Sequence, residues 1–439
     1  MVLTVIISAV SVIGMIAAVL TKPYITVKGH KLGLYWIITL VGAILLLALG
    51  CIPFKSALDG ITAKSSVNPL KILALFLSMT LLSVYLGDAG FFDFIADSVF
   101  LRTKGGKLKL FLVLYAVVSV LTVFTSNDVI ILTFTPPICI FARKAKVSPL
   151  PFLIGEFVAA NTWSMTLIVG NPTNVYLASS FGIGFAEYFS VMFLPAILGG
   201  VTGLAVILLL FRKDLLTPVT DFSGSRPITS PDHHVKVQKA PMIVAVIHLA
   251  LCIILLSVTD YLKVEMWLIC VVLALSLTAF DLFYDLIVIK SAAPVWRSIK
   301  KEPYELIPFV LSMFVIVLAL KECGVISMLN DALISGEKAD GFYIGAISAI
   351  SANLLNNIPM SVMFESIIGS SSLSAVYGAV IGSNVGAFIT PVGALAGIMW
   401  SKILADYGVK LPFLKFVAYG SAVAIPTLLA SLGGLMIIL

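Results

Sequence analysis

Charged residues are scarce in this sequence. Of its 439 residues, 11% are Asp, Glu, Lys or Arg and 60% are hydrophobic, and the mean hydropathy is +1.11. Soluble domains normally carry about 25% charged residues, so the composition excludes a soluble domain. Apolar runs of a length that spans a bilayer, about 17–25 residues, recur along the chain and leave no room for a separate globular domain. The sequence predicts an all-α polytopic membrane protein that forms one integral unit.

Cysteine and histidine are also few. The five cysteines stand singly in hydrophobic segments, without the close spacing of a zinc site or a disulfide framework. His233 and His234 are adjacent on a polar stretch, where we expect a solvated loop. No nucleophile with a base and no phosphate loop is found, so we expect no enzyme activity, no structural metal and no cofactor. We attribute the net charge of +6 to orientation in a membrane, not to nucleic-acid binding.

The chain is organised around a polar knot, Thr125-Ser126-Asn127-Asp128, between the apolar runs 110–124 and 129–140. Exposed backbone and an acid are costly in lipid, so such residues are first read as a site. A second knot, Asn356-Asn357, stands in a matching position of the second half.

The order of apolar segments repeats. The first half, 1–211, holds a hairpin at 109–142 around its knot and a broken helix at 150–181. A linker follows at 212–240, and the second half, 241–439, holds a hairpin at 342–369 and a broken helix at 374–404. Shifting the chain by 234 residues aligns 70–97 with 304–331 without a gap and matches Gly90 with Gly324. These observations favour an internal repeat.

The distribution of charged residues predicts how the two halves are oriented in the membrane. We take each knot as the tip of a re-entrant hairpin, so each half crosses five times and the second half is inverted. Placing residues 22–31 in the cytoplasm then puts 22 of the 28 Lys and Arg residues, and the linker 212–240, on that side. Both termini are then extracytoplasmic. If both arms of each hairpin crossed the membrane completely, each half would still make an odd number of crossings and the charge distribution would be the same. Segments 109–124 and 342–355, however, are short for complete crossings of about 20 residues.

The candidate binding residues lie at the two tips and at the two helix breaks. Pro and Gly free backbone groups in the middle of the broken helices, and these groups must be satisfied by protein, water or substrate. The candidates are Ser126, Asn127, Asp128, Asn161, Thr162, Asn171, Thr173, Asn174, Asn356, Asn357, Asn384 and Thr390.

Among the acids, Asp128 is the favoured coupling residue because its counterpart in the repeat, Asn357, cannot ionise. Glu156 and Glu365 are secondary candidates as proton carriers. No Lys or Arg stands in the expected interior of a hairpin or beside a break. A substrate with several carboxylates would therefore rely on helix N-termini, hydroxyls and bound sodium, whereas a neutral polyhydroxy solute needs only Asn, Ser and Thr.

These motifs carry a family resemblance. Ser126-Asn127-Asp128, Gly170-Asn171-Pro172-Thr173-Asn174, Asn356-Asn357-Ile358-Pro359 and Thr390-Pro391-Val392-Gly393 together resemble the ion-transporter superfamily, and within it the arsenite-efflux (ArsB-type) branch. The resemblance implies an inverted-repeat fold with scaffold and transport domains, an elevator movement and a homodimer in the cytoplasmic membrane of a prokaryote. As in some arsenite pumps, it also implies a soluble ATPase subunit as a possible partner besides lipid.

The resemblance bears on the substrate as well. The dicarboxylate and citrate branch usually shows Ser-Asn-Thr at both tips, whereas here the second tip reads Leu355-Asn356-Asn357. The leading hypothesis is an antiporter that exports a small metalloid hydroxide such as arsenite or antimonite in exchange for a proton on Asp128. The alternatives are sodium-coupled transport of a di- or tricarboxylate such as citrate or succinate, and sodium/proton exchange. A receptor or an enzyme that transports nothing is the hypothesis from a different class.

Overall fold

The protein is helical almost throughout, as the sequence predicts. The computed structural model describes residues 1–21, 24–27, 30–62, 68–102, 106–217, 238–369 and 372–439. One feature departs from the all-α expectation: β1 (Tyr24–Val27) and β2 (His30–Gly33) form a short antiparallel hairpin. The Gly33 N–H donates to the Glu305 carboxylate at 3.1 Å, which fixes this hairpin to a distant part of the chain. His233 and His234 lie outside the described residues.

The helices follow one another in the same order in the two halves, and they begin and end within a few residues of the expected apolar ranges. The first half contains α1 (Val2–Thr21), α2 (Leu34–Ala48), α3 (Phe54–Ile61), α4 (Pro69–Asp88), α5 (Phe91–Arg102), α6 (Lys107–Phe124), α7 (Asn127–Lys144), α8 (Leu150–Trp163), the 3-10 turns η1 (Ser164–Thr166) and η2 (Ile168–Gly170), α9 (Pro172–Ser180), α10 (Phe185–Leu210) and α11 (Arg212–Leu216). The second contains α12 (Lys239–Ser257), α13 (Thr259–Leu262), α14 (Met266–Tyr284), the π-helix η3 (Asp285–Ile289), α15 (Ala293–Lys300), α16 (Leu306–Glu322), α17 (Val325–Leu333), α18 (Asp340–Leu355), α19 (Asn357–Ile368), α20 (Leu373–Gly386), α21 (Leu395–Asp406) and α22 (Phe413–Ile438).

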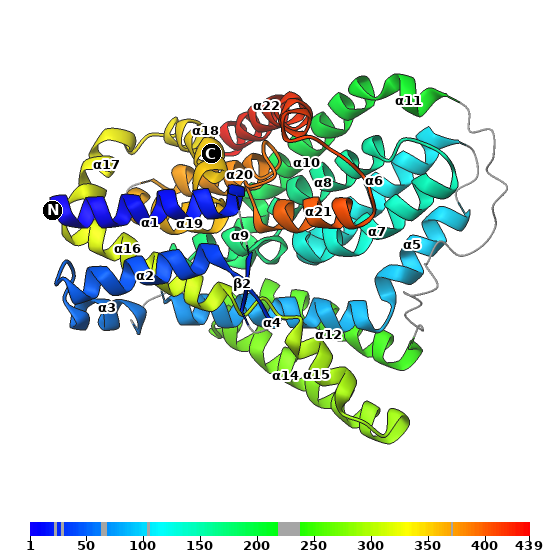
Figure 1. The fold of residues 1–439 in the computed structure, drawn as a ribbon, viewed down its shortest axis with the longest axis horizontal. Coiled ribbons are helices and arrows are strands. Elements are labelled where there is room, and N and C mark those ends of the chain that lie inside the picture. Colours follow the sequence, from blue (N-terminus) through cyan, green and yellow to red (C-terminus); the bar gives the residue numbers. More distant parts are fainter. Residues whose placement is uncertain (22–23, 28–29, 63–67, 103–105, 218–237, 370–371) are drawn as a thin grey trace.

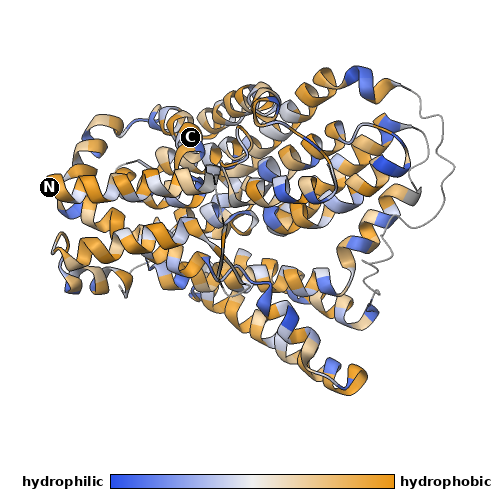
Figure 2. Cartoon of the chain, viewed as in Figure 1, coloured by the Kyte–Doolittle hydropathy of each residue, from blue (hydrophilic) through white to orange (hydrophobic). Residues whose placement is uncertain are grey.

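By length and apolar composition, six of the described helices can each cross a membrane, and α16 with α17 adds a seventh if the bent pair counts as one span. The six are α4, α6, α10, α12, α14 with η3, and α22. Helices α2 and α20, and the Val2–Ala18 part of α1, are apolar but shorter. The protein is therefore an integral membrane protein. Figure 2 shows hydrophobic residues along most of the helices and hydrophilic residues mainly towards helix ends and loops.

The helices form two groups (Figure 1). In the first, α1 packs on α2, α2 on α16, and α4 on α12 and α14. In the second, α6 packs on α8, α10 on α22, and α18 on α20. Helices α5 to α7 lie towards one end of the long axis, and α17 to α19 lie towards the other. The two hairpins α6–α7 and α18–α19 are thus at opposite ends of the molecule.

Two glycines turn the chain from one group to the other. Gly90, between α4 and α5, has φ 86°, and Gly324, between α16 and α17, has φ 85°. Helices α16 and α17 meet at 81°. A positive φ of this size is readily adopted by glycine and is costly for residues with a Cβ atom. The two positions are the pair that the sequence alignment at an offset of 234 matches.

Small residues let α18 and α20 approach closely. A Cβ atom added at Gly378 would lie 2.1 Å from the Gly341 carbonyl oxygen, and one at Gly382 would lie 1.9 Å from the Ser348 hydroxyl. Spaced glycines of this kind allow helix backbones to touch in membranes. This contact places α20, with Asn384 near its end, against the first arm of the second hairpin.

Candidate substrate and ion site

The first knot is a break between two helices. Helix α6 ends at Phe124, and α7 begins at Asn127 with Asp128 in its first turn. The Asn127 amide nitrogen donates to Asn161 Oδ1 at 3.1 Å. Ser126 Oγ and Asn127 Oδ1 are buried and have no partner within the described part of the chain. Orphaned buried polar atoms are rare in native proteins and mark a place where water or a ligand binds.

Asp128 is half-buried, and among the described residues it makes no hydrogen bond or ion pair. Its position in the first turn of α7 favours negative charge, because the free N–H groups of a helix N-terminus carry partial positive charge. The carboxyl group is therefore available to exchange a proton or to bind a cation.

The second knot is built differently. Helix α18 ends at Leu355, and Asn356 adopts φ 72° before α19 begins. The Asn357 N–H donates to the Gly393 carbonyl at 3.0 Å, and the Asn356 amide donates to the Val392 carbonyl at 3.2 Å. Asn356 Oδ1 is buried without a partner in the described structure. This tip is thus bonded directly to the interruption between α20 and α21.

Asn353, which the sequence reasoning missed, holds that interruption in place. Its Oδ1 accepts from the Thr390 N–H at 3.0 Å and from the Thr390 hydroxyl at 2.7 Å. Its amide donates to the Gly386 carbonyl at 2.9 Å. Thr390 was predicted to bind substrate, but its hydroxyl is engaged here. The sequence feature that could have identified Asn353 is its position on α18, one turn before the second knot.

Asn384 joins the two halves of the chain. Its Oδ1 accepts from the Ser164 hydroxyl at 2.8 Å and from the Asn171 amide at 2.9 Å, and its own amide donates to Asn174 Oδ1 at 2.7 Å. All of these side chains are fully or almost fully buried. Ser164 is a second residue absent from the predicted set.

The polar residues of the first break also bond to one another. Thr173 donates from its N–H and its hydroxyl to Asn171 Oδ1, at 3.2 and 3.1 Å, and lies 3.0 Å from Ser383 Oγ. The Asn174 amide donates to the carbonyls of Ser164 and Leu167. Pro172 has no N–H, so the helix cannot continue through the break. These side chains therefore satisfy backbone groups that the break leaves free.

Nine of the twelve predicted residues accordingly separate into two sets. Asn171, Thr173, Asn174 and Asn384 have hydrogen-bond partners that explain their burial, and the half-buried Thr390 is also hydrogen-bonded. Buried atoms left without partners are found on four other predicted residues: Ser126, Asn127, Thr162 and Asn356. Amide oxygens and hydroxyls suit a small solute with O–H groups, and no described Lys or Arg bonds to any of the four.

The two secondary acids differ in environment. Glu156, on α8, is 1% exposed and is hydrogen-bonded to Thr135 and Trp400. Glu365, on α19, is half-buried and accepts from the neighbouring Ser366 hydroxyl at 3.0 Å. Of the three candidate acids, Asp128 has the fewest partners.

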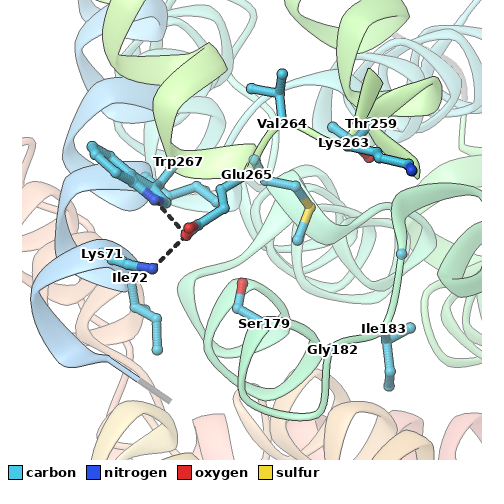
Figure 3. A pocket seen from close by; sticks show the side chains of 13 residues that line it. Lys71, Ile72, Ser179, Gly182, Ile183, Thr259, Lys263, Val264, Glu265 and Trp267 are labelled. Atoms are coloured by element: carbon cyan, nitrogen blue, oxygen red, sulfur yellow. Dashed lines mark hydrogen bonds and ion pairs between the residues drawn. The ribbon is translucent and has the colours of Figure 1, made fainter. Parts of the chain in front are cut away.

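A cavity of about 390 Å³ separates the two helix groups at another place. Figure 3 shows Lys71 on α4 paired with Glu265 at 2.6 Å, while the Trp267 indole N–H donates to the same carboxylate at 2.7 Å. Across the cavity lie Ser179 at the end of α9 and Gly182 beyond it. None of the predicted site residues lines this cavity.

Apolar spans, helices that stop at buried polar knots and amide-lined breaks define an integral membrane transport protein. The Citrate transporter family model matches residues 5–376. The chain belongs to that family, within the ion-transporter superfamily. It is a secondary transporter and not an enzyme.

Proteins similar to this chain include arsenical pump membrane proteins. An arsenical pump membrane protein of Escherichia coli is 26% identical over 436 residues, covering 95% of this chain and 96% of its own. A putative arsenical pump membrane protein of Bacillus subtilis is 22% identical and covers 86% and 88%. Among solved structures, the Alcanivorax borkumensis YdaH transporter superimposes with a TM-score of 0.58 at 14% identity, covering 99% of this chain and 97% of that one. This likeness shows a shared fold.

Proposed function

We propose that the protein exports a small uncharged metalloid hydroxide of the arsenite or antimonite type in exchange for protons, with Asp128 as the coupling residue. The observation that carries the proposal is Asp128 itself, an acid without a hydrogen-bond or ionic partner among the described residues. It adjoins buried amide and hydroxyl atoms that also lack partners. Protonation and deprotonation of this carboxyl change the charge at the knot without breaking an ion pair. The names of the arsenical-pump relatives support the substrate class.

The test is arsenite uptake into everted vesicles driven by a proton gradient. We expect Asp128→Asn to abolish gradient-driven uptake while arsenite counterflow without a gradient persists. Asp59→Asn, an exposed acid on α3, is the matched control and should transport normally. Wild-type gradient-driven uptake in the Asp128 variant would overturn the proposed coupling.

Sodium-coupled transport of citrate, succinate or a related carboxylate is the second candidate, because the matched family model is that of a citrate transporter. Sodium/proton exchange is the third. The thermal midpoint of the purified protein, measured with each ligand at two pH values, distinguishes the three candidate functions. Stabilisation by arsenite favours the first, sodium-dependent stabilisation by a carboxylate favours the second, and stabilisation by sodium alone favours the third.

We further propose that the two halves, 1–211 and 241–439, are inverted repeats, with α6–α7 and α18–α19 as re-entrant hairpins of a moving transport domain. Hairpins at opposite ends of the molecule support this, as do the matched bends at Gly90 and Gly324. Three proposals depend on the family alone: a homodimer, contact with a soluble ATPase subunit, and a bacterial inner membrane. The external location of both termini is a proposal that depends on the distribution of Lys and Arg.

A further inference from the structure

Glu156 lies where helices α7, α8 and α21 meet. Its carboxyl group is held on α8, Thr135 Oγ1 on α7 lies 2.9 and 3.1 Å from its two oxygens, and the Trp400 indole nitrogen on α21 lies 3.4 Å from Oε2. The three side chains are each at most 1% exposed. Helix α7 carries the first knot, and α21 follows the second break. The carboxyl therefore contacts both halves of the chain.

The number of hydrogen atoms available at this contact indicates the protonation state of the Glu156 carboxyl group. The Thr135 hydroxyl has one hydrogen, and Thr135 Oγ1 lies 2.6 Å from the Ile131 carbonyl oxygen. If the hydrogen is directed to that closer acceptor, the hydroxyl offers Glu156 only lone pairs. An ionised carboxylate would then have the long Trp400 contact as its one donor, and an uncompensated buried charge is very costly. A protonated carboxyl instead donates to Thr135 Oγ1 and satisfies every group.

The surroundings supply no compensating charge. Within the described structure, Cys139 on α7 is the titratable side chain that interacts with Glu156, and no Lys or Arg does. A cavity of about 460 Å³ reaches the other side of this contact and is lined by Trp400, Ser401, Lys410 and Phe416, among others. The carboxyl is thus one indole ring away from a space large enough to hold water.

We propose that Glu156 is a second proton-binding site of the transporter, occupied in this conformation and loaded through the cavity beside Trp400. Its part in coupling rests on the proposed function. Release of the proton requires the Thr135 hydroxyl to turn from Ile131 to the new carboxylate. Thr135 is followed by Pro136 and Pro137, which lack N–H groups, so α7 is weakly held at this point. Proton occupancy at Glu156 is thereby tied to the helix that carries Asp128.

The direct test is infrared spectroscopy of the purified protein, which distinguishes protonated carboxyl groups from carboxylates. We expect a component of the protonated-carboxyl absorption that Glu156→Gln removes and that the exposed control Glu187→Gln leaves in place. Thr135→Val should shift the band, because the acid loses its acceptor, and this variant keeps the test valid if Glu156→Gln does not fold. A band unchanged in both Glu156→Gln and Thr135→Val would overturn the proposal.

Transport tests the coupling part separately. We expect Glu156→Gln to retain arsenite counterflow but to move fewer protons per arsenite than wild type, because the amide mimics the protonated acid. An unchanged ratio would show that Glu156 holds its proton throughout the cycle and would overturn its coupling role. The infrared result does not depend on the substrate, so failure of the arsenite hypothesis and failure of this proposal give different outcomes.

Discussion

At the scale of single residues, the sequence identified the polar side chains of the buried centre but not their tasks. Asn384 and Asn171 stood out because amides beside a helix break in a membrane need partners. The structure shows that these two residues bind each other. Which amide faces a ligand and which faces protein depends on contacts between segments more than 200 residues apart. Local pattern carries no information on such contacts, and for the same reason Ser164 was missed. Asn353 was missed because its partners, Gly386 and Thr390, belong to another helix and to the break that follows it.

Glu302 provides a prediction about pH. It lies between α15 and α16, is 7% exposed, and neither carboxylate oxygen has a partner among the described residues. Burial raises the pKa of Glu302 from 4.5 to about 8. The folded protein thus keeps this proton up to about pH 8, whereas the unfolded chain releases it near pH 4.5. The contribution of protonated Glu302 to the free energy of unfolding is complete below pH 4.5. It is lost as the pH rises towards 8, and the free energy of unfolding falls by at most about 1.4 kcal/mol per pH unit.

Glu302→Gln should therefore raise the thermal midpoint in detergent at pH 8 and change it little at pH 5. The exposed acid variant Asp59→Asn serves as the control and should show no such difference. An equal effect of Glu302→Gln at the two pH values would contradict the burial argument.

At the scale of elements, hydrophobic run length and Pro and Gly positions located almost every long helix. They missed the short ones: β1 and β2, and the amphipathic helices α3 and α15. These elements are too short for a hydrophobic periodicity to be recognised. The β1–β2 hairpin is also held by Glu305, which is remote from it in sequence. The sharp bends after α4 and α16 were also not foreseen, although the aligned glycines marked their positions.

Gly324→Ala tests the second bend. A Cβ atom at this position meets only Ser327 Oγ at 4.0 Å, so the cost comes from φ 85° and not from a clash. We expect a loss of about 1 kcal/mol in the free energy of unfolding. Gly433→Ala, inside α22 with open space around its Cβ position, should be neutral or stabilising. Equal losses in the two variants would argue against a conformational cost at Gly324.

At the scale of the whole molecule, composition alone determined the class, and the combined motifs predicted the superfamily to which the chain belongs. Orientation rests on charge, since 22 of the 28 Lys and Arg residues fall on one predicted side. Substrate identity could not be predicted, because neutral amides and hydroxyls accept many solutes. The relatives' names and the family description point to different substrates.

Orientation is open to a direct measurement. A single cysteine at Lys213, in the polar stretch after α10, should react with a membrane-impermeant thiol reagent in everted vesicles and not in intact spheroplasts. A cysteine at Lys55, on α3, should show the reverse. The variants require replacement of the five native cysteines by alanine. The opposite labelling pattern would place the termini in the cytoplasm.

The two knots are held by different numbers of hydrogen bonds, and this difference has a consequence for the size of solute that the site accepts. Asn356 and Asn357 are bonded to Val392 and Gly393, and Asn353 adds bonds to Thr390 and Gly386. Among the described residues, the first knot has one side-chain bond to a part of the chain outside its own hairpin, from Asn127 to Asn161. A solute that needs extra room therefore gains it by breaking one hydrogen bond on the first side or several on the second. For the proposed substrate site, we therefore expect the first knot to yield to a larger solute before the second does.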